Sequence, residues 1–395
     1  MTMHQTNDVV ICSAARTPIG KFLGVFTGTP ATRLGSIALS AATARARVRP
    51  QDIEEVVMGC VLPANLGQSP ARQASLGAGL PVSTPTSTVN KVCGSGLKAV
   101  MLAADGLALG HYKVAVAGGM ECMSNAPFLV PTARAGHKAG HVALLDHMMK
   151  DGLEDAYETG RAMGTFGEDT ARRYGFTREE QDAYAVETVR RAQRCVEDGT
   201  FGREVVPVDL GAAGTVTRDE IPGKIDPAKI PRLKPAFAAD GTVTAASSSA
   251  NADAAAALVL STRGHADRLG IPVLATVRAH ASFARKPSEF TIAPAGAVHK
   301  VLQRLDWRPH DVDLYEINEA FAVVVMAAMR ELSLTHDRVN VHGGACALGH
   351  PIGASGARVL VTLLNAMQMR DARRGIATLC IGGGEAVAMA VEREG

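Results

Sequence analysis

Two cysteines stand at glycine-rich turns in opposite halves of the chain, Cys93 in the segment NKVCGSG (residues 90–96) and Cys380 in the segment CIGGGE (residues 380–385). A thiol at the first turn of a helix faces unpaired N–H groups and the positive end of the helix dipole, which lower its pKa. We therefore expect Cys93 to be a nucleophile with an accessible thiolate. His350, in the loop GHPIG, has an unperturbed pKa of about 6.5 that suits a general base. Together these residues could carry base-assisted acyl transfer.

Each of these side chains also has an ordinary structural interpretation. Cysteine is common in protein cores, so Cys93 or Cys380 alone is as often structural as reactive. The strand-to-helix turn at Cys93 nevertheless resembles a nucleophile elbow. Gly382 opens a run of three glycines whose backbone N–H groups could hold an oxyanion or a phosphate. Asn318 precedes an expected helix, where it is either an N-cap or a residue that holds a water molecule.

The remaining thiols and histidines offer no comparable setting. With seven cysteines and no C-x-x-C pair, the chain is expected to keep reduced thiols in a reducing compartment. The cysteines expected to be structural are Cys12, Cys60, Cys122, Cys195 and Cys346. Three histidines, at positions 137, 141 and 147, lack a metal-ligand spacing, so no metal site is expected.

Composition narrows the class of protein. A chain of 395 residues, 47% hydrophobic and with 40 glycines, predicts two or three domains of tightly turned α/β layers. The net charge of +2 gives no reason to expect a nucleic acid or a membrane surface as partner. Residues 1–6 lack the apolar core of a signal peptide, and the longest apolar run, residues 320–329, is too short to span a bilayer. We therefore expect a cytoplasmic protein.

The chain also contains an internal duplication. Three segments of the first half recur in the same order in the second half, which chance does not readily produce. The pairs are DIEEVVMG and DVDLYEIN (52–59 and 311–318), SGLKAV and SGARVL (95–100 and 355–360), and AGGME and IGGGE (117–121 and 381–385). Two similarly folded halves follow from this repeat.

Each half alternates β-branched runs with helical stretches, which predicts sheets covered by helices. Strands are expected at residues 9–15, 55–61, 86–92, 113–117, 273–283, 313–317, 376–381 and 386–391. Helices are expected at residues 32–48, 94–109, 296–305, 320–332 and 355–369. Residues 124–250 have no counterpart in the repeat and include a charged helix at 177–198, so they form either an inserted lid or binding platform, or a surface decoration.

Taken together, the segments around Cys93, Asn318, His350 and Cys380 resemble the motif set of the thiolases, and most closely its acetyl-CoA acetyltransferase branch. The resemblance covers nearly the whole chain. It implies a layered αβαβα core made of residues 1–123, completed by 251–270, and residues 271–395. It further implies that residues 124–250 are a loop domain that binds coenzyme A, and that the protein is a homotetramer built as a dimer of dimers.

The resemblance also implies a role for each site residue. Cys93 would become acylated, His350 would activate it, and Cys380 would exchange the α-proton of a second acetyl group. One thioester oxygen would be held by His350 and an Asn318-bound water, and the other by the N–H groups of Cys93 and Gly382. The residues that would line the pantetheine or acyl tunnel are Met163, Phe237, Ala245, Ser249, Ala320 and Phe321.

The implied reaction is reversible Claisen condensation of two acetyl-CoA to acetoacetyl-CoA and CoA. No cofactor is expected, because the CoA thioesters are substrates. Ala162 and residues 247–253 depart from the usual family pattern, which concerns CoA contacts and acyl-chain preference. Three alternatives stay open. The first is a degradative thiolase for longer 3-ketoacyl-CoA, and the second is a non-catalytic acyl-CoA-binding or thiol-redox protein. The third, a ketoacyl-synthase-like enzyme, is disfavoured because such an enzyme would have a histidine at the position of Cys380.

Overall fold

The computed structural model describes residues 6–394. The expectation that no signal peptide is present concerns residues 1–6, and residues 1–5 lie outside the described part. Within the described chain, no helix combines the length and apolar character needed to cross a membrane.

Ten strands form one mixed sheet with the order β12-β13-β14-β11-β1-β10-β5-β3-β4, and β2 pairs with β10. Their bounds are β1 (Val9–Arg16), β2 (Gly20–Lys21), β3 (Glu55–Gly59), β4 (Thr86–Val89), β5 (Val114–Cys122), β10 (Ala252–Thr262), β11 (Ala275–Ala284), β12 (Leu314–Ile317), β13 (Arg374–Ile381) and β14 (Glu385–Glu392). Strand β3 runs parallel to β4 and β5, and β12 runs parallel to β13. In the described part of the chain, the two halves of the sheet join through two residue pairs between β1 and β11.

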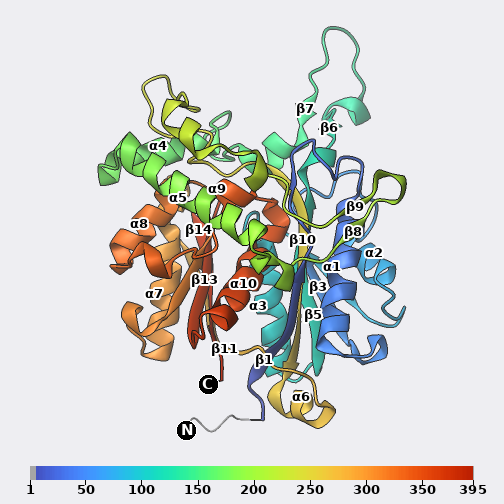
Figure 1. Ribbon diagram of the computed structural model, residues 1–395. Helices are drawn as coiled ribbons and strands as arrows, with labels where there is room; N and C mark the ends of the chain where they lie inside the picture. Colours follow the sequence, from blue (N-terminus) through green and yellow to red (C-terminus); the bar gives the residue numbers. More distant parts are fainter. Residues whose placement is uncertain (1–5, 395) are drawn as a thin grey trace.

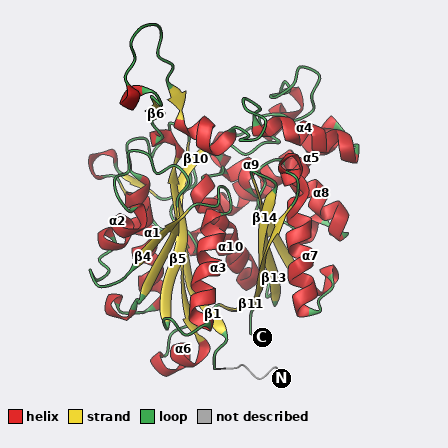
Figure 2. Ribbon diagram, turned by 180° about the vertical axis from the view of Figure 1, so that it is seen from behind, coloured by secondary structure: helices red, strands yellow, loops and turns green. Residues whose placement is uncertain are grey.

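Helices cover both halves of the sheet and fill the space between them (Figures 1 and 2). The helices outside the insert are α1 (Ala31–Ala46), α2 (Pro70–Gly77), α3 (Ser95–Ala108), α6 (Arg263–Leu269), α7 (Ala293–Leu305), α8 (Ala322–Leu332), α9 (Ala345–Leu348) and α10 (Ile352–Met369). Helices α3 and α10 share one apolar core with strands of both halves. Helix α1 packs on one outer face, and α7 and α8 on the other. The order is therefore helix, sheet, helix, sheet, helix.

Apolar periodicity explains why these elements form. The paired strands β5 and β13 are almost continuously buried, as expected of strands covered by helices on both faces. Helix α10 lies between the two sheets and buries residues around its whole circumference. Because it is surrounded, its sequence lacks the polar face of a surface helix.

The expected elements of the repeat are confirmed, with shifts of a few residues at their ends. Strand β10 was not expected, because its sequence, ADAAAALVLST, is rich in alanine, a strong helix former. It pairs with β1 on one side and β5 on the other, so both neighbours and both helix layers approach it closely. Small side chains fit that position, and tertiary packing overrides the local helix preference.

Residues 124–250 lie over the ends of the sheets where α3 and α10 begin (Figure 1). The insert contains α4 (Met163–Tyr174), α5 (Arg178–Glu197) and the short strands β6 (Phe128–Leu129), β7 (Leu145–Asp146), β8 (Val208–Asp209) and β9 (Thr215–Val216). Helix α5 begins with a capping box between Thr177 and Glu180, which explains its sharp start. The insert is tied to the core by Arg16, a fully buried side chain that pairs with Glu204 and Asp219 at 2.6 Å each.

Candidate active site

Cys93 occupies a tight turn between β4 and α3. The strand ends at Val89, three residues earlier than the expected end at Val92. Val92 has φ of 45°, a left-handed conformation that is strained for a β-branched residue. Ser95 stabilises the turn, because its Oγ accepts the Lys91 N–H (2.8 Å) and donates to the Val92 carbonyl (2.6 Å). The turn presents the Cys93 thiol half-buried, in the manner of a nucleophile elbow.

The glycine turn after β13 meets the Cys93 turn from the other half of the chain. A Cβ placed on Gly382 would lie 4.0 Å from Cγ1 of Val92 and 3.3 Å from the methyl carbon of Met163. Lys91 forms an ion pair with Glu385, which joins the two turns directly. The backbone N–H groups of Gly382 and Cys93 lie near enough to the Cys93 sulfur to lower its pKa. Two backbone donors therefore converge at the reactive position of the thiol.

The expected low pKa of Cys93 is wrong for this structure. Burial raises the pKa of the thiol to about 11, and the N–H groups of Gly382 and Cys93 offset only part of that rise. Desolvation destabilises the Cys93 thiolate more than the helix terminus and the two N–H donors stabilise it. The thiol is therefore protonated at neutral pH and needs a base to become nucleophilic.

Cys380 lies next to Cys93 at the end of β13. Its side chain is 1% exposed and packs in one cluster with Ala320, Phe321, Met163 and Phe237. Burial raises the pKa of the Cys380 thiol, and the charge of an ionised Cys93 raises it further. The two thiols therefore oppose each other's ionisation, and removal of the Cys93 charge favours the Cys380 thiolate.

His350 is held at the start of α10 with one ring nitrogen free. The backbone N–H of His350 donates to the Ala250 carbonyl (2.8 Å), and the ring Nδ1 lies 2.5 Å from Oγ of Ser355. Ser355 gives its own proton to the Pro351 carbonyl (3.0 Å), so its oxygen accepts the Nδ1–H of His350. The buried Nε2 has no partner and carries the lone pair. Burial and then Arg358 lower the pKa of His350 to about 3, so the imidazole is neutral and able to accept a proton.

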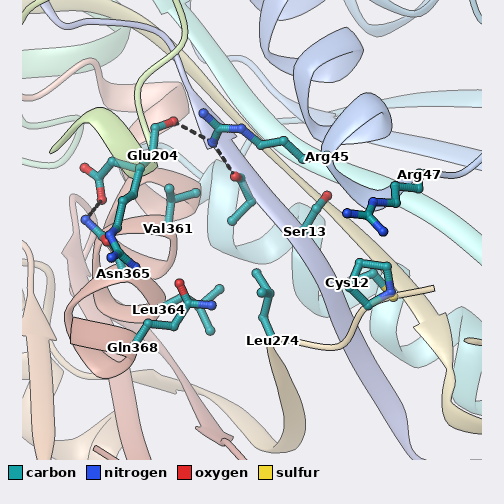
Figure 3. Close-up of a pocket in the computed structure, with 13 residues that line it drawn as sticks. Cys12, Ser13, Arg45, Arg47, Glu204, Leu274, Val361, Leu364, Asn365 and Gln368 are labelled. Atoms are coloured by element: carbon teal, nitrogen blue, oxygen red, sulfur yellow. Dashed lines mark hydrogen bonds between the residues drawn. The ribbon is translucent and has the colours of Figure 1, made fainter. Parts of the chain in front are cut away.

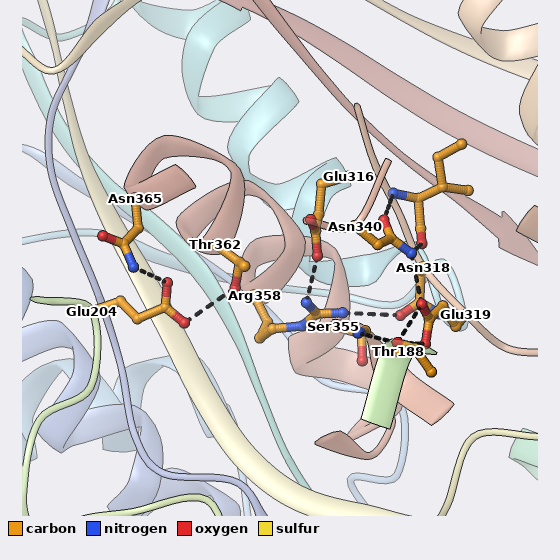
Figure 4. A network of polar contacts seen from close by, with 12 residues as sticks. Thr188, Glu204, Glu316, Asn318, Glu319, Asn340, Ser355, Arg358, Thr362 and Asn365 are labelled. Carbon is orange, nitrogen blue, oxygen red and sulfur yellow. Dashed lines mark hydrogen bonds and ion pairs between the residues drawn. The ribbon is translucent and has the colours of Figure 1, made fainter. Parts of the chain in front are cut away.

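Asn318 does not cap a helix. The N-cap of α8 is Phe321, three residues later, so the interpretation of Asn318 as an N-cap is wrong. Its Oδ1 accepts from Arg358 (3.3 Å), whereas its buried Nδ2 has no protein partner (Figure 4). A buried amide donor without a partner costs about 1–3 kcal/mol unless water or a ligand accepts from it. The geometry suits a donor that holds water.

Three buried charged residues around Asn318 were missed as separate site residues. Arg358 donates to Glu316 at 3.0 Å, and both are almost fully buried on opposing elements. Burial raises the pKa of Glu316 to about 8 and Arg358 lowers it. Glu319 accepts from Tyr184 (2.7 Å) and from Cys346 N–H (3.0 Å), which ties α5 of the insert to the Asn318 turn (Figure 4). The sequence signal for this buried cluster was Arg358, a single arginine in the otherwise apolar sequence of α10.

Glu121 was also missed. At the end of β5, its buried carboxylate accepts the N–H groups of Val61 (3.0 Å), Leu62 (3.3 Å) and Gly353 (3.0 Å). Burial raises its pKa to about 7, and these three donors lower it. Glu121 therefore anchors the first turn of α10, and with it the His350 loop, to the first half of the chain.

The residues expected to line a tunnel are only partly brought together. Met163, Phe237, Ala320 and Phe321 pack around Cys380, and the rings of Phe237 and Phe321 lie edge to face at 5.9 Å. Ser249 joins them through its N–H to the Ala320 carbonyl (3.0 Å). Ala245 is exposed on the same loop as Ser249 and has no contact of this kind.

The other thiols lie buried in the structure, as expected of structural cysteines. Burial raises the pKa of Cys12 to about 12 and that of Cys195 to about 12. Among residues 6–394, no group of three or more His, Cys, Asp or Glu side chains is arranged to hold a metal ion.

Comparison with known proteins matches nearly the whole chain to one family. The family model for the thiolase N-terminal domain matches residues 9–264, and that for the thiolase C-terminal domain matches residues 271–393. The chain is 48% identical to acetyl-CoA acetyltransferase 1 of Arabidopsis thaliana, over 98% of this chain and 95% of that protein. It is 47% identical to acetyl-CoA acetyltransferase of Cupriavidus necator, over 98% and 100%. A crystal structure of Acat5 thiolase from Ascaris suum in complex with coenzyme A matches with a TM-score of 0.94 and 43% identity, over 98% of this chain and 100% of that one.

Proposed function

This chain belongs to the thiolase family, and from that premise we propose that Cys93, His350 and Cys380 are its catalytic residues. The protein is an acyltransferase whose activity is the reversible condensation of two acetyl-CoA to acetoacetyl-CoA and CoA. The observation that supports the assignment most is the meeting of the Cys93 turn with the glycine turn after β13, where Gly382 approaches Val92 and Lys91 pairs with Glu385.

In the first half-reaction, the free Nε2 of His350 takes the proton of Cys93 as the sulfur attacks the thioester carbonyl. The C–S bond to coenzyme A breaks, the acetyl group stays on Cys93, and the proton passes from His350 to the leaving CoA sulfur. A base is required because the pKa of Cys93 is raised to about 11. His350 supplies it because its imidazole is neutral and its buried Nε2 has no protein partner.

In the second half-reaction, the free Nε2 of His350 takes the proton of the Cys380 thiol, and the Cys380 sulfur removes an α-proton from the second acetyl-CoA. The resulting carbanion attacks acetyl-Cys93, so a C–C bond forms and the C–S bond to Cys93 breaks. His350 then gives its proton to the Cys93 sulfur and Cys380 keeps the α-proton, so all three groups return to their starting protonation states. Acetylation removes the negative charge that Cys93 could carry, and with it one cause of the raised Cys380 pKa.

Two groups of donors would stabilise the thioester oxygens. We propose that the N–H groups of Cys93 and Gly382 hold one oxygen, and that Nε2 of His350, while it carries the proton taken from a thiol, holds the other together with a water on Nδ2 of Asn318. Loss of one such donor typically costs about 10²–10³ in rate, or roughly 3–4 kcal/mol. Met163, Phe237, Ala245, Ser249, Ala320 and Phe321 are proposed to line the path of the pantetheine and acyl groups.

The division of the chain into two halves and a CoA-binding insert of residues 124–250 remains a proposal. The insert covers the ends of α3 and α10, which supports it. Deleting the insert would not test it, because buried Arg16 and Glu319 would lose their partners. Phe237→Ala, with CoA affinity measured by calorimetry, is the better test, because its ring lies against Phe321 and Gly164.

A homotetramer in the cytoplasm is likewise proposed. The hairpin of β6 and β7 projects from the core, and Phe128 (63% exposed) and Leu144 (63%) are open on it, which suits burial against another subunit. Light scattering after gel filtration would give the mass. The compartment needs a direct test by cell fractionation, since a relative from Bos taurus is named mitochondrial.

Intact-mass spectrometry tests the nucleophile. After mixing with acetyl-CoA, the protein should gain one acetyl group on the peptide that contains Cys93. Cys93→Ala should lose this adduct, whereas Cys195→Ala, which removes a buried thiol in α5, should keep it. An adduct that persists in Cys93→Ala would contradict the assignment. A series of 3-ketoacyl-CoA substrates of increasing chain length then tests acetoacetyl-CoA preference against broader degradative activity.

A further inference from the structure

A cavity of about 350 Å³ lies away from the catalytic residues, between the end of α1, strand β1 and the second half of α10 (Figure 3). Its apolar wall includes Val361 and Leu364 of α10 and Leu274 from the segment before β11. None of Cys93, His350, Asn318 or Cys380 lines it. The volume is at the lower end of that found for small-molecule sites in proteins.

Basic side chains surround this cavity. Arg45 is fixed, because its guanidinium donates to the carbonyls of Ala14 (2.8 Å), Glu204 (3.0 Å) and Val205 (3.1 Å). Arg47 and Arg203 also line the cavity, are exposed, and have no side-chain hydrogen bond or ion pair within residues 6–394.

The one carboxylate on the wall does not cancel this charge. Glu204 pairs with buried Arg16 at 2.6 Å and also accepts from Thr362 (3.2 Å). The guanidinium groups of Arg47 and Arg203 are therefore left to an anion, since arginine binds carboxylates and phosphates through paired N–H groups.

Asn365 adds a requirement for a hydrogen-bond donor. Its side chain is 4% exposed, and its Nδ2 donates to the Thr200 carbonyl (3.2 Å) and to Glu204 (3.3 Å). Because both partners are acceptors, the orientation of the amide is determined. The buried Oδ1 faces no donor in the protein, although Asn365 lines the cavity. An occupant with a hydroxyl or N–H group would satisfy it.

We propose that this cavity binds a small organic anion that carries a hydroxyl or amide N–H group, such as a phosphate monoester of a polyol. The anionic group pairs with Arg47 and Arg203, the donor group with Oδ1 of Asn365, and the carbon skeleton rests on Val361 and Leu364. A cation is repelled by the two arginines, and a purely apolar ligand leaves both arginines and the amide oxygen without partners.

Calorimetric titration with glycerol 3-phosphate tests the proposal on the intact enzyme. Saturating CoA is present throughout, so that the substrate site cannot bind the phosphate. Binding to the wild type is expected. The double variant Arg47→Ala/Arg203→Ala should weaken it by about tenfold or more, because two charge-assisted contacts are lost. Arg33→Ala is the matched control, since it removes an exposed arginine from the same helix outside the cavity.

Propyl phosphate, which has the same charge and length without hydroxyl groups, should bind roughly fivefold more weakly than glycerol 3-phosphate, as loss of one hydrogen bond of about 1 kcal/mol requires. Two results overturn the proposal: no binding of glycerol 3-phosphate with a Kd below roughly 10 mM, or full affinity in the double variant. Equal affinity for the two esters overturns the assignment of Asn365.

Discussion

The two halves of the chain use equivalent residues for the same local contact and for different chemistry. Ser95 at the start of α3 and Ser355 at the corresponding position of α10 each donate to a backbone carbonyl three or four residues earlier. In the first half the serine oxygen accepts the Lys91 N–H, which shapes the nucleophile turn. In the second half it accepts from the imidazole of His350. The two serines thus keep the same contact with their own backbone. They differ in the group that donates to the serine oxygen, a backbone N–H in the first half and an imidazole in the second.

The same correspondence holds for two glutamates and two glycines. Glu121 ends the first AGGME-like segment and holds Gly353 of the second half, whereas Glu385 ends the other and pairs with Lys91 of the first half. Each half therefore fixes the active turn of the other. Helices α3 and α10 cross where Gly96 and Gly356 lie, since a Cβ on either would meet backbone nitrogen of the other helix, at 2.7 Å and 2.3 Å. The catalytic turns are positioned by this crossing.

The largest expected effect distinguishes the two thiols. Cys380→Ala should still accept an acetyl group on Cys93, because the first half-reaction uses His350 as base. Condensation should fall by about 10³ or more, since no group removes the α-proton. Single-turnover measurements of each half-reaction make the separation visible. If Cys380→Ala condensed normally, Cys380 would be a core thiol, and the comparison of two catalytic turns would fail.

The helix crossing predicts a large loss of stability. Gly356→Ala should lower the free energy of unfolding by roughly 3 kcal/mol, because the new methyl group meets the backbone of α3 rather than a flexible side chain. Gly96→Ala should have a similar effect at the equivalent site. Gly202→Ala is the control, since a Cβ there meets nothing within 4 Å. Urea unfolding midpoints measure the difference. Equal midpoints for all three variants would mean that a methyl group fits between α3 and α10 at the crossing.

The serine comparison predicts a smaller effect on catalysis. Ser355→Ala should slow acetylation of Cys93 by about tenfold, since the His350 tautomer with a free Nε2 loses its hydrogen bond, worth roughly 1–1.5 kcal/mol. Ser36→Ala removes a similar buried hydroxyl that donates to the carbonyl four residues earlier, but meets no imidazole. Its acetylation rate should match the wild type. Stopped-flow measurement of CoA release gives the acetylation rate of each variant. If the Ser355→Ala rate equalled that of the wild type, Ser355 would not position His350.

The smallest expected effect is that of pH on acetylation. The Cys93 pKa is raised to about 11 and the His350 pKa is lowered to about 3, so neither group changes protonation near neutrality. The rate should change little between about pH 6 and 9, fall as His350 takes a proton toward pH 3, and rise as Cys93 ionises toward pH 11. Rapid-quench rates across this range test it. A steep rise centred near pH 7 would show that the thiol is more acidic than its burial implies.

Much of the fold was predictable from local pattern. Alternating apolar runs predicted β1, β3, β5 and the strands of the second half, and the repeated segments predicted that α3 and α10 are equivalent. The motif residues Cys93, His350 and Cys380 were identified because glycines and prolines around them mark turns rather than cores. These features depend on neighbours in the sequence, which is why the sequence reports them.

Tertiary structure alone decided the features that depend on neighbours in space. The alanine-rich strand β10 is extended because β1 and β5 leave no room for a helix between them. The pKa of Cys93 rises rather than falls because burial in the folded chain disfavours the charged thiolate. Glu319 and Arg358 matter because the insert and α10 bury them beside Asn318. Residue types and order determined which groups could react, and burial by distant segments determined their protonation states and their partners.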